Sequence, residues 1–156
     1  MHGMGVVSQF SKNIHINNFK GEPRKESGRT IAAFADFLHF SGCYGKITVE
    51  NSLFSGSHDD DINVHGTHLR VMESNGNKIK VRFMHEQTWN LDAFEKGDSI
   101  AFVDNKTLLA YGNAIVKSVE KISKRELQLE LDRPAPRGVK ENHCVENLTK
   151  TPEVVI

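Results

Sequence analysis

The chain has 156 residues, and its 20 lysines and arginines balance its 20 aspartates and glutamates. A chain without net charge gives no electrostatic reason to expect a nucleic acid or an anionic membrane surface as a partner. No apolar run approaches the roughly 20 residues of a membrane-spanning helix. We therefore expect neither nucleic acid nor membrane as a partner, and the length suits one ordinary domain or two small ones.

Residues 1–65 contain short segments with alternating apolar residues, which is the pattern of β-strands. Ile14 and Ile16 precede an Asn-Asn-Phe sequence, and Ile47 and Val49 precede a similar block that ends at Phe54. Repeated short strands with asparagine and glycine corners are typical of a solenoid, and we predict rungs of a parallel β-helix here. Residues 31–40 are compatible either with a helical turn or with another strand.

Residues 66–140 change character and predict a small antiparallel β-barrel. Apolar residues alternate on both sides of Asn75-Gly76, a strong hairpin turn signal. Further strand patterns follow over 100–103, 114–116 and 127–131, which gives four to six strands in about 70 residues. A proline-rich segment closes this section, and we expect residues 141–156 to return to a rung of the β-helix.

The segment from His58 to Gly66 carries three adjacent carboxylates, Asp59, Asp60 and Asp61. Crowded carboxylates repel one another, so one of them tends to keep a proton near neutral pH. A protonated acid beside an ionised base is what glycoside hydrolysis requires. Asp36 lies 23 positions before Asp59, so a coil of roughly 20–25 residues would place them on one face. The competing interpretation is a solvated acidic turn.

Metal sites are the other interpretations of this segment. Asp59, Asp61 and Asn63 have the spacing at which an EF-hand loop begins, but valine stands at the sixth position and arginine at the twelfth. His58, His65 and His68 could suggest zinc, although His65 and His68 should point to opposite sides of a strand. We therefore expect no metal and no cofactor.

Two further side chains and the two cysteines admit alternatives. His65 could orient a carboxylate or bind a substrate hydroxyl. Trp89 lies in a polar loop, where its ring could stack on a sugar or plug the barrel. Cys43 and Cys144 are expected to be free thiols rather than a disulfide.

Several motifs together resemble glycoside hydrolase family 110, the exo-acting α-1,3-galactosidases. The resemblance covers nearly the whole chain, and its most specific part is the Asp-Asp-x-x-Asn-Val-His-Gly sequence within 59–68. The other matching stretches are 3–11, 27–30, 35–36, 97–98, 108–109, 146–149 and 151–154.

The resemblance implies an all-β fold, a right-handed parallel β-helix with inserted small β-barrels. It also implies an inverting glycosidase that removes terminal α-galactose from glycans. The family acts on extracellular glycans, so we expect the full-length protein to be periplasmic, at the cell surface or secreted.

The resemblance assigns catalysis to Asp36, Asp59 and Asp60. By analogy with polygalacturonase-type β-helices, Asp59 would protonate the leaving group, while Asp36 and Asp60 would hold the attacking water. We assign substrate binding to Asn63, His65, Trp89 and Glu146.

Family members are several times longer than this chain, so we expect it to be an internal fragment. Rungs without caps would expose strand edges, which favours self-association and low activity of the isolated chain. Two other functions remain open: a polygalacturonase-like glycosidase and a carbohydrate-binding β-solenoid without catalysis.

Overall fold

The computed structural model describes residues 3–156, so the first two residues of the predicted first domain lie outside it. The described residues are almost entirely strand and loop, with one 3-10 turn, η1 (Lys25–Ser27). They divide into two units, one reaching to Gly66 and including Thr151–Ile156, the other holding Thr67–Lys150. Within the described residues, the structure contains no helix with the length and apolar character needed to cross a membrane.

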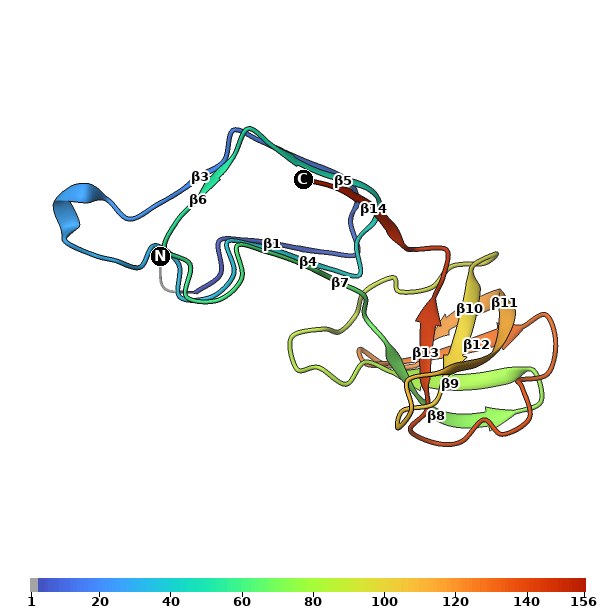
Figure 1. The fold of residues 1–156 in the computed structure, drawn as a ribbon. Helices are drawn as coiled ribbons and strands as arrows, with labels where there is room; N and C mark the ends of the chain where they lie inside the picture. Colours follow the sequence, from blue (N-terminus) through green and yellow to red (C-terminus); the bar gives the residue numbers. More distant parts are fainter. Residues whose placement is uncertain (1–2) are drawn as a thin grey trace. The chain divides into compact units, whose positions relative to one another are not determined.

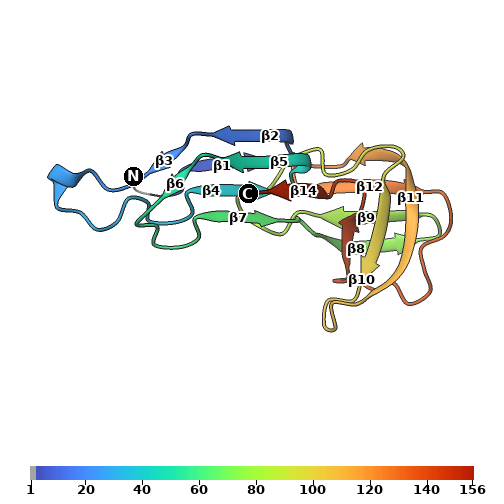
Figure 2. The same ribbon diagram turned by 45° about the horizontal axis from the view of Figure 1, so that its top comes forward.

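The first unit consists of parallel strands arranged in three small sheets, β1-β4-β7, β2-β5-β14 and β3-β6. In Figure 1 the strands of each sheet lie almost one behind the other, and in Figure 2 they lie side by side. The strands are β1 (Val6–Gln9), β2 (Lys12–Asn17), β3 (Lys20–Gly21), β4 (Leu38–Ser41), β5 (Tyr44–Glu50), β6 (Leu53–Phe54), β7 (Ile62–His65) and β14 (Pro152–Val155).

The strand register shows how far the chain travels between neighbouring strands of one sheet. Val6 pairs with Leu38, 32 positions later, and Leu38 pairs with Ile62, 24 positions later. We call the segment between two strands paired in this way a circuit. The predicted interval of 20–25 residues is therefore correct for the second circuit, from β4 to β7, and wrong for the first, from β1 to β4. The first circuit is longer because it includes the excursion around η1, which the sequence pattern did not reveal.

The predicted repeat between the two Ile-x-(Ile/Val) segments is confirmed. Ile14 pairs with Ile47, and Ile16 pairs with Val49. These side chains point toward a core that includes the fully buried Leu38, Phe40 and Ile47. Burial of this apolar surface, worth roughly 25 cal/mol per Å², is what drives the sheets together.

Three phenylalanines that are far apart in the sequence form an aromatic cluster in the same unit. The rings of Phe19 and Phe54 are stacked with centroids 5.4 Å apart, and the Phe37 ring lies 5.9–6.1 Å from both. Residues 31–40 form no helix, because Phe37, Leu38 and Phe40 are all fully buried and Leu38–Ser41 pairs as strand β4. The strand alternative for this segment is therefore the correct one.

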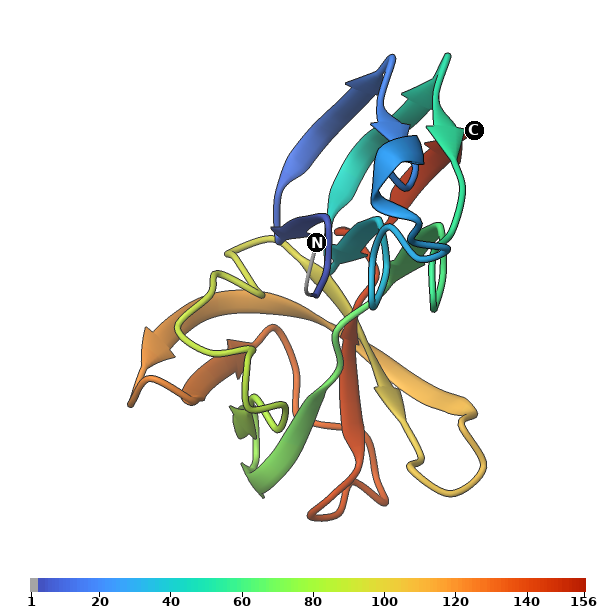
Figure 3. The same cartoon turned by 90° about the vertical axis from the view of Figure 1, so that its left-hand side faces the viewer.

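The second unit is a closed antiparallel barrel in the order β10-β11-β12-β9-β8-β13. Figure 3 shows its strands from another side, coloured from green to red. The predicted hairpin at Asn75-Gly76 is confirmed, since Val71 pairs with Val81 and Asn75 with Lys78. The strands are β8 (Leu69–Asn75), β9 (Lys78–Arg82), β10 (Ser99–Val103), β11 (Ala110–Lys121), β12 (Glu126–Leu131) and β13 (Cys144–Asn147).

Strand β13 differs from the prediction that the chain leaves the barrel at residue 141. Its residues pair with β10 and with β8, so they close the barrel. The return to the parallel strands begins only at Thr151. The alternating pattern of residues 141–150 is short, and it looks the same whether its partner strand is parallel or antiparallel.

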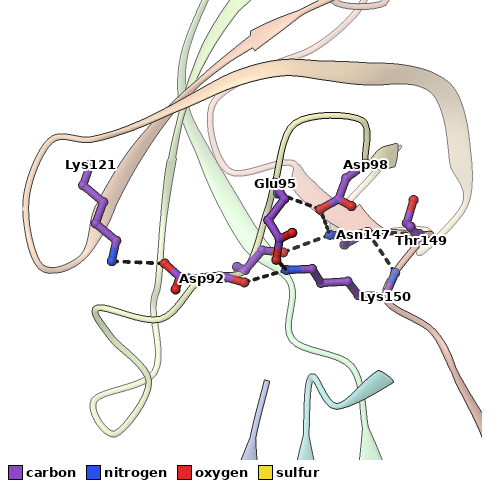
Figure 4. Close-up of polar contacts among 8 residues, drawn as sticks. Asp92, Glu95, Asp98, Lys121, Asn147, Thr149 and Lys150 are labelled. Carbon is purple, nitrogen blue, oxygen red and sulfur yellow. Dashed lines mark hydrogen bonds and ion pairs between the residues drawn. The ribbon is translucent and has the colours of Figure 1, made fainter. Parts of the chain in front are cut away.

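A buried polar network explains why the chain stays in the barrel as far as residue 150 (Figure 4). The Asn147 amide donates to Asp98 at 2.7 Å and to the Ala93 carbonyl at 2.9 Å. The Lys150 ammonium, whose side chain is 7% exposed, bonds the Asp92 carbonyl and the Glu95 carboxylate, each at 2.8 Å. Buried polar groups need such partners, so these bonds hold the end of the barrel unit in place.

Candidate active site

The structure brings together the three aspartates that the sequence singled out. One carboxylate oxygen from each of Asp36, Asp59 and Asp60 lies within 4.8 Å of the other two. Asp36 is buried, whereas Asp59 and Asp60 are exposed in the loop before β7. The cluster therefore joins one buried carboxylate to two that face solvent.

The backbone holds these residues in place through pairing between neighbouring circuits. The Phe37 amide donates to the Asp60 carbonyl at 3.2 Å, and the Leu38 amide donates to the Asp61 carbonyl at 3.1 Å. Continuing the register of β4 and β7 places Asp36 beside Asp60, one position later than the predicted Asp59. Since Asp59 and Asp60 are adjacent, both still reach Asp36.

Gly5 allows the first circuit to approach Asp36 closely. Its amide donates to the Asp36 carbonyl at 2.9 Å. A Cβ atom on Gly5 would lie 2.3 Å from the Phe37 carbonyl oxygen, so only glycine fits there without a shift of the backbone. On the other side, the Ser57 hydroxyl donates to the Asp59 and Asp60 carbonyls at 2.9 and 3.1 Å.

Each of two aspartates is held by the side chain three positions later. His39 Nδ1 lies 2.5 Å from Asp36 Oδ2, and Asn63 Nδ2 donates to Asp60 Oδ2 at 3.3 Å. His39 and Asn63 pair in the register of β4 and β7, so these contacts are equivalent in neighbouring circuits. Of the residues assigned to substrate binding, Asn63 and His65 belong to this neighbourhood.

His39 is the site residue that the sequence analysis missed. Its signal was present, because Asp36-x-x-His39 aligns with Asp60-x-x-Asn63 once the 24-residue register is known. His65 in turn lies 3.1 Å from His39, measured between their Nε2 atoms. The prediction that His65 orients a carboxylate is thus replaced by an indirect contact through His39.

The metal interpretations gain no support from this geometry. Among the described residues, the group with ligand-type atoms close enough to hold an ion is Asp36, Asp59 and Asp60, and it contains no histidine. The zinc trio of His58, His65 and His68 is therefore not assembled, and Asp61 does not join the group. A cluster of acidic residues does not by itself make a metal site, so we assign none.

The other two predicted site residues, Trp89 and Glu146, belong to the barrel unit. Trp89 is 44% exposed, and the ammonium of Lys124 lies 5.4 Å from its ring centroid. The side chain is therefore not fully buried in the barrel. Glu146 lies half-buried on β13, opposite Ala101 of β10.

The barrel unit also contains a polar cluster beside a cavity of about 410 Å³. The Tyr111 hydroxyl and His143 Nδ1 are 2.7 Å apart. Burial, and the nearby charge of Asp104, raise the pKa of Tyr111. Backbone amides of Thr107 and Lys106 donate to Asp104 and lower its carboxyl pKa. Tyr111 and His143 thus pair with each other, and Asp104 accepts from the two backbone amides.

Both cysteines are free thiols, as expected. Cys43 is buried among the parallel strands, and its Sγ lies 3.3 Å from the Ser8 carbonyl oxygen. Burial raises the pKa of Cys144, which lies half-buried in the barrel. Neither thiol is a contact of the three aspartates.

Comparison with known proteins gives a consistent result. Residues 78–145 match the family model of GLAA-B beta-barrel domain II. The chain is 46% identical to alpha-1,3-galactosidase A of Bacteroides fragilis over 158 residues, and 49% identical to the enzyme of that name from Akkermansia muciniphila over 157 residues. Both alignments cover 100% of this chain and 26% of the relative. Along its whole length the chain is therefore similar to part of proteins named alpha-1,3-galactosidase A.

Proteins named alpha-1,3-galactosidase B also match the chain. Alpha-1,3-galactosidase B of Bacteroides thetaiotaomicron is 35% identical over 155 residues, which cover 99% of this chain and 25% of that protein. The chain therefore spans about a quarter of the length of the α-1,3-galactosidases that it matches. The resemblance to this family is confirmed, and the family match of the barrel agrees with its closed sheet.

Proposed function

We propose that this chain contributes the catalytic carboxylates of a glycosidase that removes terminal α-1,3-linked galactose from glycans. The observation that carries the proposal is the meeting of Asp36, Asp59 and Asp60 within 4.8 Å, in a family whose members are named for this activity. Glycosidases generally need one carboxylic acid and one carboxylate at the scissile bond. A cluster of three supplies both, with one carboxylate to spare.

The proposal includes a fold for the parallel unit and an organisation for the chain. We propose that the three parallel sheets are the sides of a β-helix, with successive circuits as its rungs. The barrel unit would then be an insertion between two rungs, because the chain enters it after Gly66 and rejoins the parallel strands at β14. Parallel pairing of β14 with β5 supports this order.

Within the cluster we propose Asp59 as the general acid, with Asp36 and Asp60 holding the attacking water. Asp59 and Asp60 are exposed and can meet a substrate, whereas Asp36 is buried. The Asp60 carboxylate accepts a hydrogen bond from Asn63, which leaves Asp59 as the exposed carboxyl group that can meet the leaving group.

We propose inversion of the anomeric configuration, as the family resemblance implies. Carboxyl groups about 6.5–9.5 Å apart are typical of inverting enzymes, and a separation of about 5–5.5 Å is typical of retaining ones. The nearest oxygens here lie within 4.8 Å, so the separation gives inversion no support of its own. The anomer released by the enzyme decides this point.

For substrate contacts we propose Asn63 and His65 beside the cluster. Within the barrel unit, we propose that the ring of Trp89 stacks on a sugar face and that Glu146 accepts a hydrogen bond from a sugar hydroxyl. Sugars suit such a mixture, because a pyranose presents both apolar faces and a belt of hydroxyls. Each contact predicts a weaker affinity when the side chain is truncated.

A second candidate substrate class is favoured by a cavity in the same unit. This cavity, of about 540 Å³, is lined in part by Lys20, Arg24 and Arg29. Cationic side chains would bind the carboxylates of a uronic-acid polymer. Oligogalacturonide is therefore the comparison substrate for activity measurements.

The proposal is tested by replacing each aspartate with asparagine, in this chain and in a version extended at both ends to the length of its relatives. Asp61→Asn is the matched control, since Asp61 is adjacent to the cluster but outside it. We expect Asp59→Asn and Asp60→Asn to lower kcat by about 10²–10⁴, the usual worth of an acid or base. Equal activity of the Asp60 and Asp61 variants would contradict the proposal.

A further inference from the structure

Asp36 is the first member of a series of three side-chain contacts that ends on a backbone carbonyl group. We call this series the chain of contacts. Asp36 Oδ2 contacts His39 Nδ1 at 2.5 Å, and His39 Nε2 contacts His65 Nε2 at 3.1 Å. His65 Nδ1 then contacts the Gly66 carbonyl oxygen at 2.8 Å. The two imidazole rings meet edge to face, with centroids 4.9 Å apart and an angle of 72°.

The backbone end of this chain determines where its protons lie. A carbonyl oxygen only accepts, so Nδ1 of His65 must carry a proton. If the His65 ring is neutral, its Nε2 accepts, and Nε2 of His39 must donate. Nδ1 of His39 then either accepts from a protonated Asp36 or, in an imidazolium, donates to a carboxylate.

Counting protons gives the same result without choosing between these states. Three hydrogen bonds need three protons, whereas two neutral imidazoles supply two. If His65 were the imidazolium instead, the count would still be three. If all three contacts are hydrogen bonds, the arrangement needs one proton more than two neutral imidazoles supply.

We propose that His39 and His65 are positioning residues that hold Asp36 through this chain, and that the chain keeps one proton more than two neutral imidazoles supply. The catalytic meaning of this inference rests on the proposed function. The proton count itself is a property of the folded chain, and it is measured without any substrate.

The surroundings of the chain favour the extra proton. On the β1 side the residue in register with His39 is Val7, and on the β7 side it is Asn63, neither of which is charged. Asp59 and Asp60 add two carboxylates within 4.8 Å of Asp36.

The arrangement gives different roles to Asp36 and Asp60, the two carboxylates proposed to hold the attacking water. Asp36 contacts an imidazole, which can gain or lose a proton, whereas Asp60 accepts a hydrogen bond from the Asn63 amide, which does not titrate. Asp60 then acts as the base toward the water, and Asp36 orients the water. With Asp36 neutralised, Asp59 and Asp60 remain as one acid and one base.

The test is nitrogen-15 NMR of the imidazole rings in the 156-residue chain at pH 7.5, where a free imidazole is mostly neutral. Long-range proton–nitrogen correlations show which ring nitrogens are protonated, and His39→Asn and His65→Asn assign the signals among the eight histidines. We expect His65 protonated at Nδ1 and a strongly downfield proton between His39 and Asp36. His65 protonated only at Nε2, or both rings neutral and protonated only at Nδ1, would overturn the proposal.

A variant gives a second readout that a merely structural role would not move. His65→Ala frees Nε2 of His39 from its partner, so we expect His39 to become a neutral ring protonated at Nδ1. An unchanged His39 signal in that variant would overturn the proposed link between His39 and His65. These spectra do not depend on galactosidase activity. Failure of the proposed function and failure of this inference can therefore be told apart.

Discussion

The parallel unit and the barrel unit organise their strands in different ways. Each barrel strand pairs with two others, so the six strands close on themselves. The parallel sheets have open outer strands, and Val7 and Val154 on such strands are 51% and 42% exposed. The comparison teaches that three of the six barrel pairings join strands consecutive in sequence, whereas the aspartate cluster depends on the parallel pairing of β4 with β7, 24 positions apart. The following predictions test that contrast.

The largest expected effect comes from the aromatic cluster of the parallel unit. Phe37→Ala should lower the free energy of unfolding by about 3–5 kcal/mol, because it removes a fully buried ring. Urea unfolding followed by circular dichroism measures the loss. Because Phe37 follows Asp36, the imidazole signals of His39 and His65 should move as well.

The matched control is Phe102→Ala, which removes an equally buried ring from the barrel. It should cost a similar amount but leave the His39 and His65 signals unchanged. Equal disturbance of those signals by both variants would show that the aspartate cluster depends on the barrel as much as on its own circuits.

Asn147→Ala should destabilise the barrel by about 1–3 kcal/mol, because it leaves the buried Asp98 carboxylate and Ala93 carbonyl with fewer partners. Hydrogen exchange of the β10 and β13 amides reports the change within the barrel. Thr149→Val is the milder control, since it removes only the bond from the Ser99 amide at the exposed end of the network. A larger effect of the control would contradict the central place of Asn147.

The pH dependence of barrel stability should follow Asp104 and Asp132. Hydrogen bonds from Thr107 and Lys106 lower the pKa of Asp104, while Arg133 lowers that of Asp132. A lowered carboxyl pKa stabilises the fold above the unfolded value of about 3.9, and the contribution disappears as the pH falls through the folded pKa.

Urea unfolding between pH 6 and pH 2.5 measures this small effect. Asp104→Asn and Asp132→Asn should each make the free energy of unfolding less dependent on pH in that range. A dependence as steep in the double variant as in the original chain would exclude these two residues as its source.

The smallest effect concerns the thiols. Burial raises the pKa of Cys144, so less thiolate is present at neutral pH and alkylation should be slower than for an exposed cysteine. Iodoacetamide labelling followed by mass spectrometry measures the rate. Labelling at the rate of the urea-unfolded chain would contradict the burial.

Sequence patterns predicted the strands and the turn that depend on neighbouring residues. The hairpin at Asn75-Gly76 and the repeat of Ile14 with Ile47 are examples, because turn chemistry and alternation are local properties. The excursion around η1 and the place of β13 in the barrel were not predicted. Both depend on which distant segment a strand meets, and alternation alone does not carry that information.

In the candidate site, too, some residues could be predicted from sequence motifs, whereas others depend on the pairing of distant strands. Asp36, Asp59 and Asp60 could be selected because their types, their crowding and the family motif pointed to one chemistry. His39 could not, since a single histidine on a buried strand gives no signal until the register aligns it with Asn63. The contact of His39 with His65 likewise depends on the stacking of β4 and β7.

The most direct test of the central claim is proton NMR of galactose release from an α-1,3-linked galactose disaccharide by the extended protein. The anomer formed first is read before mutarotation, and Asp59→Asn and Asp61→Asn are run beside it. The account predicts that β-galactose appears first, that Asp59→Asn abolishes its release and that Asp61→Asn does not. Absence of release, or release unaffected by Asp59→Asn, would contradict the assignment of these carboxylates, and α-galactose appearing first would contradict inversion.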